Sequence, residues 1–419
     1  MSEWSTKKIE ECAEILDHLR IPVNEEERSA NPGTTPYFGA NGIQGYINGW
    51  LFDEPLILMA EDGGYFEDFA TRPIAYRISG KSWVNNHAHI LRPKPNICFN
   101  YLFYSLEHKN ITPFIKGGTR AKLNQKELRE VEILVPTCKE RQKNISLILQ
   151  TVDKAIEQTE ALIEKYSLVK AGMMHDLFTR GLTPDGKLRP PREEAPDLYT
   201  ETPSGWFPKE WDHKKLKSLY KNPIRDFGSF SSTNLITFLK DGVPFIKSEM
   251  IKEEEVDWSS VSYISEKVHA MLSKSHVQKG QILFSKIGSA LGKAVLYDGA
   301  AGVCNSNAAV AKIEVDQSVI EPQFLEVFLN SKFARKQFEL MIVSLLPRIN
   351  LGDIDKLLIQ VPSPDEQKMI CKRYNALKTK LLLEKDNLKK LQLQKSGLMH
   401  DLLTGQVHVK LNDPEAADV

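Results

Sequence analysis

The chain has 419 residues, 41% hydrophobic and 26% charged, and its 55 basic and 55 acidic residues give a formal net charge of zero. This length predicts two or more domains, because single hydrophobic cores stop growing at about 250–300 residues. The neutral balance shows no general basic excess for nucleic acid, although local clusters can still make a basic surface. No apolar run reaches the roughly 18 residues that cross a bilayer, and the polar N-terminus lacks a signal-peptide core, so we expect a cytoplasmic protein. The five cysteines form no CxxC pair, which argues against a zinc ribbon or a disulfide framework.

Residues 1–138 predict a mainly β domain. "TTPYFGANGIQGYINGWLFDEPLILMAEDGG" alternates short apolar and aromatic runs with Gly, Asn and Asp, which is typical of strands joined by tight turns. "CFNYLFYSLEH" then predicts an amphipathic helix, and the Gly-rich loop "FIKGGTRAKLNQ" carries Lys116, Arg120 and Lys122. Cations beside Gly and Asn suit contact with phosphate, while the composition fits an ordinary solvated loop equally well.

Residues 139–180 predict a long helix. Apolar side chains recur at spacings of three and four between Ile145 and Met173, which is the pattern of a coiled-coil seam. At about 1.5 Å per residue, a helix of about 40 residues spans roughly 60 Å. Its end is predicted at the phrase "KAGMMHDLFTRGL", where Gly181 is a C-terminal stop signal. The Pro-rich residues 181–209 indicate an extended connector with turns.

Residues 210–364 predict a second body of the same kind. "GVPFIKSEMI", "GQILFSKIGSALGKAVLYDG" and "GVCNSNAAVAKIEV" have the pattern of strands, and "PQFLEVFLNSKFARKQFELM" predicts one amphipathic helix. The following loop, "LLPRINLGD", has Arg348 as its lone cation. A second long helix is predicted over residues 365–408, and residues 409–419 indicate a frayed tail.

The two halves repeat. "KSGLMHDLLTGQV" matches the earlier phrase, with His400 following His175 by 225 positions. "VEILVP" and "KLLIQVP" close the two bodies, "EWSTKKI" and "EWDHKKL" open them, and Asn85 of "WVNNHAH" is matched with Asn305 of "VCNSNAA". Similar helices beside divergent bodies suggest that the helices share one task and that the bodies perform two related tasks.

The two apolar stripes favour helices packed on each other as an antiparallel coiled coil. The alternative is that each helix lies with one amphipathic face on its own body. The doublets His175-Asp176 and His400-Asp401 are better explained by contacts at helix ends than by metal binding, because neighbouring side chains on a helix diverge and a third ligand is missing nearby.

Catalytic motifs are incomplete. "GSALGKA" has three residues between its glycines and Ala294 after the lysine, so it fails the phosphate-loop pattern. "FGANG" lacks the following helix and acidic residue of an S-adenosylmethionine pocket. No Ser/His/Asp or Cys/His pairing repeats in the two halves. The sequence therefore argues against a self-sufficient methyltransferase or nuclease, and we expect no catalytic residue, cofactor or metal in the chain itself.

The ordered pair of half-repeats, each ending in "MHDLFTRGL" or "MHDLLTGQV", resembles the specificity subunit of a type I restriction-modification system. "GTRAKLNQKELREVEILVP" and "LPRINLGDIDKLLIQVP" are similar to the ends of its target-recognition domains. The resemblance implies an α+β fold with two mainly β target-recognition domains separated by two long antiparallel helices. Each domain would read one half of an asymmetric, split target in double-stranded DNA. The helices would set the spacing and recruit two methyltransferase subunits, which carry S-adenosylmethionine, and endonuclease-translocase subunits would join them.

The resemblance also indicates where DNA contacts are expected. These positions are the basic-loop residues Lys116, Arg120, Lys122 and Arg348 and the strand-turn residues Lys286, Ser289, Lys293 and Asn307. Arg and Lys can pair with guanine and Asn with adenine, yet any of these side chains could contact phosphate instead. A scaffold of two lobes and a coiled coil that binds only proteins is the alternative function. Salt-sensitive affinity for DNA distinguishes the two.

Overall fold

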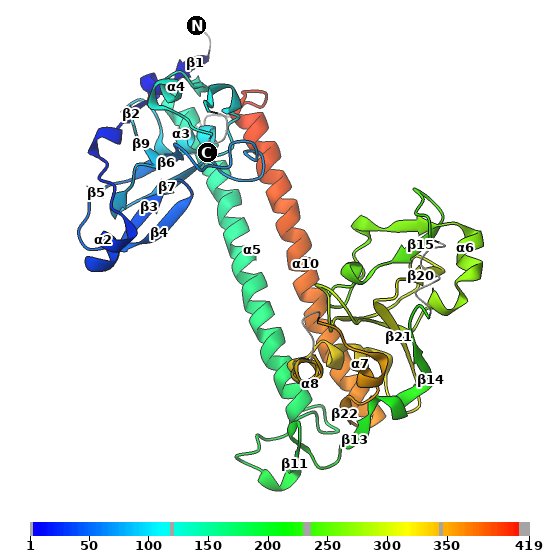
Figure 1. Cartoon of the computed structure of the whole chain (residues 1–419). Coiled ribbons are helices and arrows are strands. Elements are labelled where there is room, and N and C mark those ends of the chain that lie inside the picture. Colours follow the sequence, from blue (N-terminus) through cyan, green and yellow to red (C-terminus); the bar gives the residue numbers. More distant parts are fainter. Residues whose placement is uncertain (1–2, 118–120, 229–235, 343–346, 410–419) are drawn as a thin grey trace, which may run out of the picture. The chain divides into compact units, whose positions relative to one another are not determined.

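The computed structural model describes residues 3–117, 121–228, 236–342 and 347–409 (Figure 1). The chain divides into two compact units, and each contains one β-rich body and a part of each long helix. Unit 1 consists of Met1–Leu162 and Glu384–Val419, and unit 2 of Ile163–Leu383. We call residues 3–138 body 1 and residues 210–363 body 2. In the described part of the chain, no helix is long and apolar enough to cross a membrane.

Body 1 is built on two four-stranded sheets. One is antiparallel, in the order β2-β9-β6-β7, and the other has the order β4-β3-β8-β5 with β3 and β8 parallel. A separate pair, β1 and β10, joins the beginning of the body to its end. The strands are β1 (Trp4–Lys8), β2 (Ala13–Ile15), β3 (Thr35–Gly39), β4 (Gly42–Ile47), β5 (Phe52–Asp53), β6 (Leu56–Ala60), β7 (Ala75–Ile78), β8 (Lys81–Val84), β9 (Ala88–Pro93) and β10 (Glu132–Pro136).

The core of body 1 follows from its apolar strands. Strand β6, with the sequence Leu-Ile-Leu-Met-Ala, is buried along its whole length because it lies between β9 and β7 and is covered on both faces. Helix α3 supplies Tyr101, Leu102 and Leu106 to the same core. The helices of this body are α1 (Ile9–Cys12), α2 (Glu25–Ala30), α3 (Phe99–Glu107) and α4 (Gln125–Arg129).

Body 2 has the same plan. Its antiparallel sheet has the order β14-β21-β18-β19, and its second sheet, β16-β15-β20-β17, contains the parallel pair β15 and β20. Strands β13 and β22 pair as β1 and β10 do, and β11 and β12 form a hairpin in the connector. The strands are β11 (Tyr199–Thr202), β12 (Gly205–Pro208), β13 (Asp212–Lys215), β14 (Tyr220–Arg225), β15 (Val243–Ile246), β16 (Ser262–Ile264), β17 (His276–Val277), β18 (Ile282–Ser285), β19 (Ala294–Leu296), β20 (Cys304–Ser306), β21 (Val310–Val315) and β22 (Leu358–Val361).

The single amphipathic helix predicted for body 2 is in fact two helices. Helix α7 (Pro322–Leu329) ends at Asn330, and α8 (Lys332–Met341) begins after Ser331. The Ser331 side chain accepts a hydrogen bond from the Ala334 amide and so caps the N-terminus of α8. The apolar periodicity of the sequence runs through this cap and does not reveal the break. The other helices are α6 (Glu266–Met271) and α9 (Leu351–Ile354).

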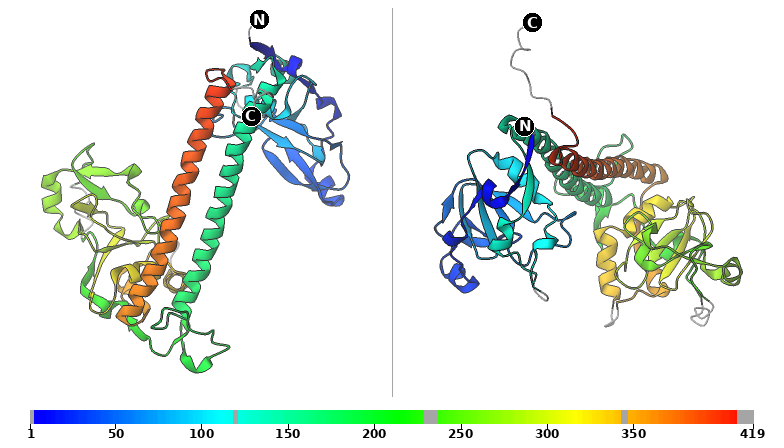
Figure 2. Two further views of the ribbon diagram at one scale, coloured as in Figure 1. Left: turned by 180° about the vertical axis from the view of Figure 1, so that it is seen from behind. Right: turned by 90° about the horizontal axis from the view of Figure 1, so that it is seen from above.

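The long helices are α5 (Lys139–Thr179) and α10 (Pro364–Leu403). In unit 1, Lys395 of α10 lies 2.8 Å from Asp153 of α5, while later α10 residues share a core cluster with earlier α5 residues. In unit 2, the Lys170 ammonium lies 5.1 Å from the Tyr374 ring. The segments within each unit therefore run antiparallel and side by side (Figures 1 and 2). The α+β fold class is confirmed.

The contact between the two long helices buries only part of their apolar stripes. Ile145, Tyr374 and Leu402 are buried, but 36% of Leu162 and 47% of Val169 are exposed. The buried ends of the helices also join the core clusters of the bodies, so helix-on-helix and helix-on-body packing both occur. Helix α10 ends at Leu403, before the predicted residue 408, because Gly405 leaves the helical region at φ 73°.

Candidate nucleic-acid interface

Bodies 1 and 2 share one pattern of backbone hydrogen bonds around the predicted loops. We call this pattern the frame; it is centred on Glu61 in body 1 and on Lys286 in body 2. The Glu61 amide donates to the His87 carbonyl at 2.9 Å, and the Lys286 amide donates to Ala309 at 2.7 Å. The carbonyl of Glu61 accepts from the amide of Leu123 at 2.7 Å. The carbonyl of Lys286 accepts in the same way from Ile349 at 3.0 Å. Glu61 and Lys286 thus occupy equivalent positions.

The frame corrects one match made from the sequence. The Asn85 amide donates to Phe38, and its side chain accepts from the His87 amide at 2.8 Å. Asn307 makes the same two bonds, to the carbonyl of Ile246 and from the amide of Ala309. Asn85 therefore corresponds to Asn307. Asn305, the residue matched from the sequence, is fully buried because it points into the core of body 2, so that match was wrong by two residues.

The basic loops meet the frame at the same place. Lys122 forms a β-bridge with Asp62, and Arg348 forms one with Ile287. Lys122 also bridges to Lys116, so the two ends of the first loop are held together. The shared frame therefore carries different side chains in the two bodies. In body 1, Glu61 and Asp62 lie beside Lys122. In body 2, Lys286 and Ile287 lie beside Arg348.

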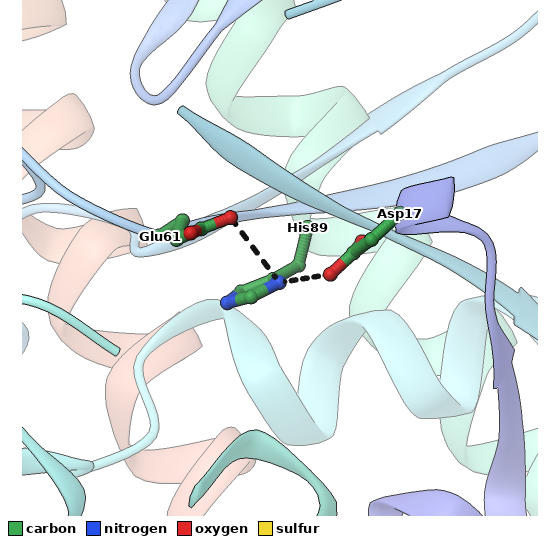
Figure 3. A group of neighbouring side chains, drawn as sticks. All are labelled: Asp17, Glu61 and His89. Atoms are coloured by element: carbon green, nitrogen blue, oxygen red, sulfur yellow. Dashed lines mark hydrogen bonds and ion pairs between the residues drawn. The ribbon is translucent and has the colours of Figure 1, made fainter. Parts of the chain in front are cut away.

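In body 1 the frame covers a buried network of charged groups (Figure 3). The Nδ1 atom of His89 lies 2.6 Å from an Asp17 oxygen and 3.7 Å from a Glu61 oxygen. Its Nε2 atom lies 2.8 Å from the Leu123 carbonyl. Both ring nitrogens face acceptors, which a doubly protonated imidazolium satisfies. Burial favours neutral Asp17, but the hydrogen bond and charge of His89 outweigh burial and lower the pKa of Asp17.

The same three residues have the spacing of a metal site, since their ligand atoms lie within 4.8 Å of one another. However, the Glu61 carboxylate already pairs with Arg20 and lies 3.0 Å from Lys122. Both nitrogens of His89 are also engaged. Two cations and a histidine offset the two carboxylates, so the group is best described as an ion-pair network that supports the frame.

In body 2 the equivalent network is basic. Lys286 lies 2.6 Å from Asp226, which follows β14 as Asp17 follows β2. The buried Lys312 ammonium donates to the Asp226 carbonyl at 3.0 Å and to Ser306 at 3.1 Å. Burial lowers the pKa of Lys312 to about 7, and the charge of Asp226 opposes that shift. One carboxylate therefore faces two lysines here.

The other predicted contact residues differ in exposure. Lys116, Ser289 and Arg348 are exposed, while Lys293 is half-buried in the turn between β18 and β19. Arg120 lies outside the described residues. The side chains of Lys122 and Lys286 engage carboxylates of their own bodies. The frame brings together Lys116 and Lys122 in body 1, and Lys286, Asn307 and Arg348 in body 2.

Sequence reasoning missed the buried partners of these residues. Asp17 and Asp226 are far from the loops in sequence and became comparable only through strand register, since β2 pairs with β9 as β14 pairs with β21. His89 and Lys312 lie on those paired strands without a repeated motif. The one usable signal was a carboxylate after β2 and after β14, the first strand of the four-stranded antiparallel sheet in each body.

The family model for the type I restriction modification DNA specificity domain matches residues 1–165 and again residues 208–393. The chain belongs to this family. As a type I specificity subunit, it is a DNA-recognition protein, and the family's repeat explains the two bodies that share one frame. The resemblance inferred from the half-repeats is confirmed.

Relatives of this specificity subunit match over most of their length. A putative type I restriction enzyme specificity subunit of Haemophilus influenzae is 24% identical over 88% of this chain and 86% of that protein. The MjaVIII specificity subunit of Methanocaldococcus jannaschii is 24% identical over 74% of this chain and 70% of its own length. The S subunit structure from M. genitalium has a TM-score of 0.61 at 16% identity and covers 96% of both chains. This structural likeness supports the fold.

Proposed function

We propose that this specificity subunit reads two unlike half-sites of a split target in double-stranded DNA, one with each body. The observation that carries the proposal is the shared frame with unlike side chains. Glu61 of body 1 is replaced by Lys286 in body 2, and Asp62 by Ile287. Glu61 and Lys286 are buried in ion pairs of their own bodies, so they change the charge and shape of the surface beside each loop and do not contact bases themselves. Equal frames with opposite chemistry favour unlike half-sites and an asymmetric target.

The exposed cations fit contact with the DNA backbone. Lys116 and Arg348 are exposed beside the frame, and either can approach a phosphate together with neighbouring backbone amides. Lys122 and Lys286 are held by carboxylates of their own bodies, so we assign them to positioning the frame. The chain itself is proposed to be non-catalytic and to act in the cytoplasm.

The long helices are proposed to recruit two methyltransferase subunits, which would supply S-adenosylmethionine, and the endonuclease-translocase subunits. Their support is a set of leucines on α5 and α10 that remain exposed in this chain. They are Leu147 (63% exposed), Leu168 (69%), Leu382 (44%), Leu383 (63%) and Leu393 (75%). Exposed apolar side chains of this size on a helix favour contact with partner proteins.

The test is selection of duplexes from a randomised DNA library by the native complex, purified through a tag on this chain. The account predicts enrichment of two unequal blocks of bases separated by a fixed number of unselected positions. Affinity should fall steeply with salt, because contacts to phosphate release counterions. A perfectly palindromic motif would contradict the unlike half-sites. Failure to enrich any sequence, with affinity insensitive to salt, would favour the protein-only scaffold.

A further inference from the structure

Body 1 has a polar hollow next to its frame. The hollow has a volume of about 530 Å³ and is lined mainly by polar side chains from α2, from the β3–β4 hairpin and from the segment after β8. Figure 1 shows β3, β4 and α2 together at one end of body 1. Small-molecule pockets are usually lined by apolar groups, so this open polar hollow is better suited to the edge of a base.

The hollow adjoins the predicted DNA surface. Asn85 and His87 line it, and His87 Nδ1 lies 2.7 Å from Asp62. Asp62 is bridged to Lys122, which is bridged in turn to the exposed Lys116. A duplex whose phosphates contact the basic loop would therefore have its base edges within reach of the hollow.

Gln44 enters this hollow because of a β-bulge. Tyr37 pairs with Gly45 and the next residue, Phe38, pairs with Ile43, so Gln44 is the extra residue on β4. A bulge redirects the side chain of the residue that it inserts. Gly39 lies beneath this side chain, since a Cβ atom there would come within 2.3 Å of the Gln44 amide carbon. In body 2, the equivalent pairing of β15 with β16 has a regular register.

The orientation of Gln44 is set by its partner Asn85. The backbone amide of His87 donates to Asn85 Oδ1, which leaves the Asn85 Nδ2 group to donate. That group donates to Gln44 Oε1 at 2.8 Å. Asn85 is 3% exposed, whereas Gln44 is exposed. Within the part of the chain that the structure describes, the Nε2 donors of Gln44 and one acceptor site on Oε1 have no further partner and can face a ligand.

We propose that Gln44 reads one adenine in the half-site of body 1 and that Asn85 is its positioning residue. An amide that offers one donor and one acceptor matches the N7 and N6 edge of adenine in the major groove. This proposal rests on the proposed function, because it assumes that body 1 reads one half of the target.

The experiment repeats the library selection with the native complex and with variants of this chain. Gln44→Ala should abolish the preference for adenine at one position of one half-site, a loss of about 5- to 150-fold in discrimination, and should leave the other half-site unchanged. Gly39→Ala should relax the same position, because its methyl group displaces Gln44. Gln317→Ala, an exposed glutamine in the turn after β21, is the matched control and should select the wild-type motif.

The Asn85→Asp variant distinguishes base recognition by Gln44 from a purely structural role of the Gln44–Asn85 pair. Its carboxylate still accepts from the His87 amide but can no longer donate to Gln44, so Gln44 should turn its own donors inward. The preferred base at that one position should then change instead of the whole half-site weakening. Retention of the wild-type motif by Gln44→Ala would overturn the proposal, and so would uniform loss of one half-site with Asn85→Asp. If the wild-type complex selects no sequence, the proposed function itself fails.

Discussion

Replacing Glu254 with Gln should destabilise unit 2 by about 2–3 kcal/mol, because two lysines would lose the carboxylate that separates them. Glu254 pairs with Lys170 of α5 and lies 3.3 Å from Lys378 of α10. Its side chain is 9% exposed, while the two lysine side chains are 23% and 25% exposed. Body 2 is thus joined to both helix segments of its own unit by one buried acid.

The magnitude follows from this burial. Breaking a fully buried ion pair costs about 3–5 kcal/mol, and a quarter exposure of each lysine lets water recover part of that cost. Glu254 also has a left-handed backbone, with φ 73°, which costs a non-glycine residue about 1 kcal/mol or more. Glu254→Gly should therefore be less damaging than Glu254→Ala by about 1 kcal/mol, since glycine relieves the strain while both remove the pair.

The assay is urea unfolding of the full chain, followed by tryptophan fluorescence in a background where Trp4, Trp50 and Trp83 of unit 1 are replaced by Phe, so that the signal comes from unit 2. The neighbouring Glu253 is the matched control, because its contact with Arg335 is 3.4 Å long and more than half exposed on both sides. Glu253→Gln should change the free energy of unfolding by less than about 0.5 kcal/mol. Equal effects of the two Glu→Gln variants on the free energy of unfolding would refute the stabilising role of the buried Glu254 ion pairs.

Three further outcomes are expected from other residues of the chain. The stability of unit 2 should rise with pH between about 7 and 10.5, because Lys312 loses its proton in the folded state before it does so in the unfolded chain; a flat pH profile from chemical denaturation would count against this. Gly181→Ala should lower the free energy of unfolding by at least about 2 kcal/mol more than Gly186→Ala, as measured by thermal unfolding. Both glycines have positive φ, but only a Cβ at position 181 would clash with the buried Glu366 carboxylate, 2.2 Å away. Arg348→Ala in the native complex should reduce the slope of log affinity against log salt by about 0.9, whereas Lys332→Ala should leave it unchanged.

Much of the fold could be predicted from the sequence because the chain contains two copies of the same half-repeat. The repeated helix-end phrases and the strands that close each body located the two bodies and the two long helices. Periodicity also located the apolar stripes of the long helices, but several residues buried near the helix ends, such as Leu177, Phe178 and Cys371, lie outside those stripes. It could not explain Lys395, which interrupts the apolar stripe of α10 and proves to pair with Glu107 at 2.9 Å and Asp153 at 2.8 Å. That reason depends on a body residue far away in the chain.

The candidate interface was less accessible. The loops were found from their repeated position, but the match of Asn85 to Asn305 was wrong because only strand register reveals the two-residue offset. The sequence predicted Lys122 and Lys286 as DNA contacts but not their partners Glu61 and Asp226, because those pairs are set by tertiary contacts. Gln44 carried no signal, because a β-bulge depends on how two strands pair and not on a motif.

The most direct test of the account is a genome-wide map of methylated bases in the source cell, with and without this gene. If each body reads its own half-site, deletion should remove methylation from one split motif whose two halves differ in sequence. Unchanged methylation on deletion, or loss of a motif whose halves are inverted copies of each other, would contradict it.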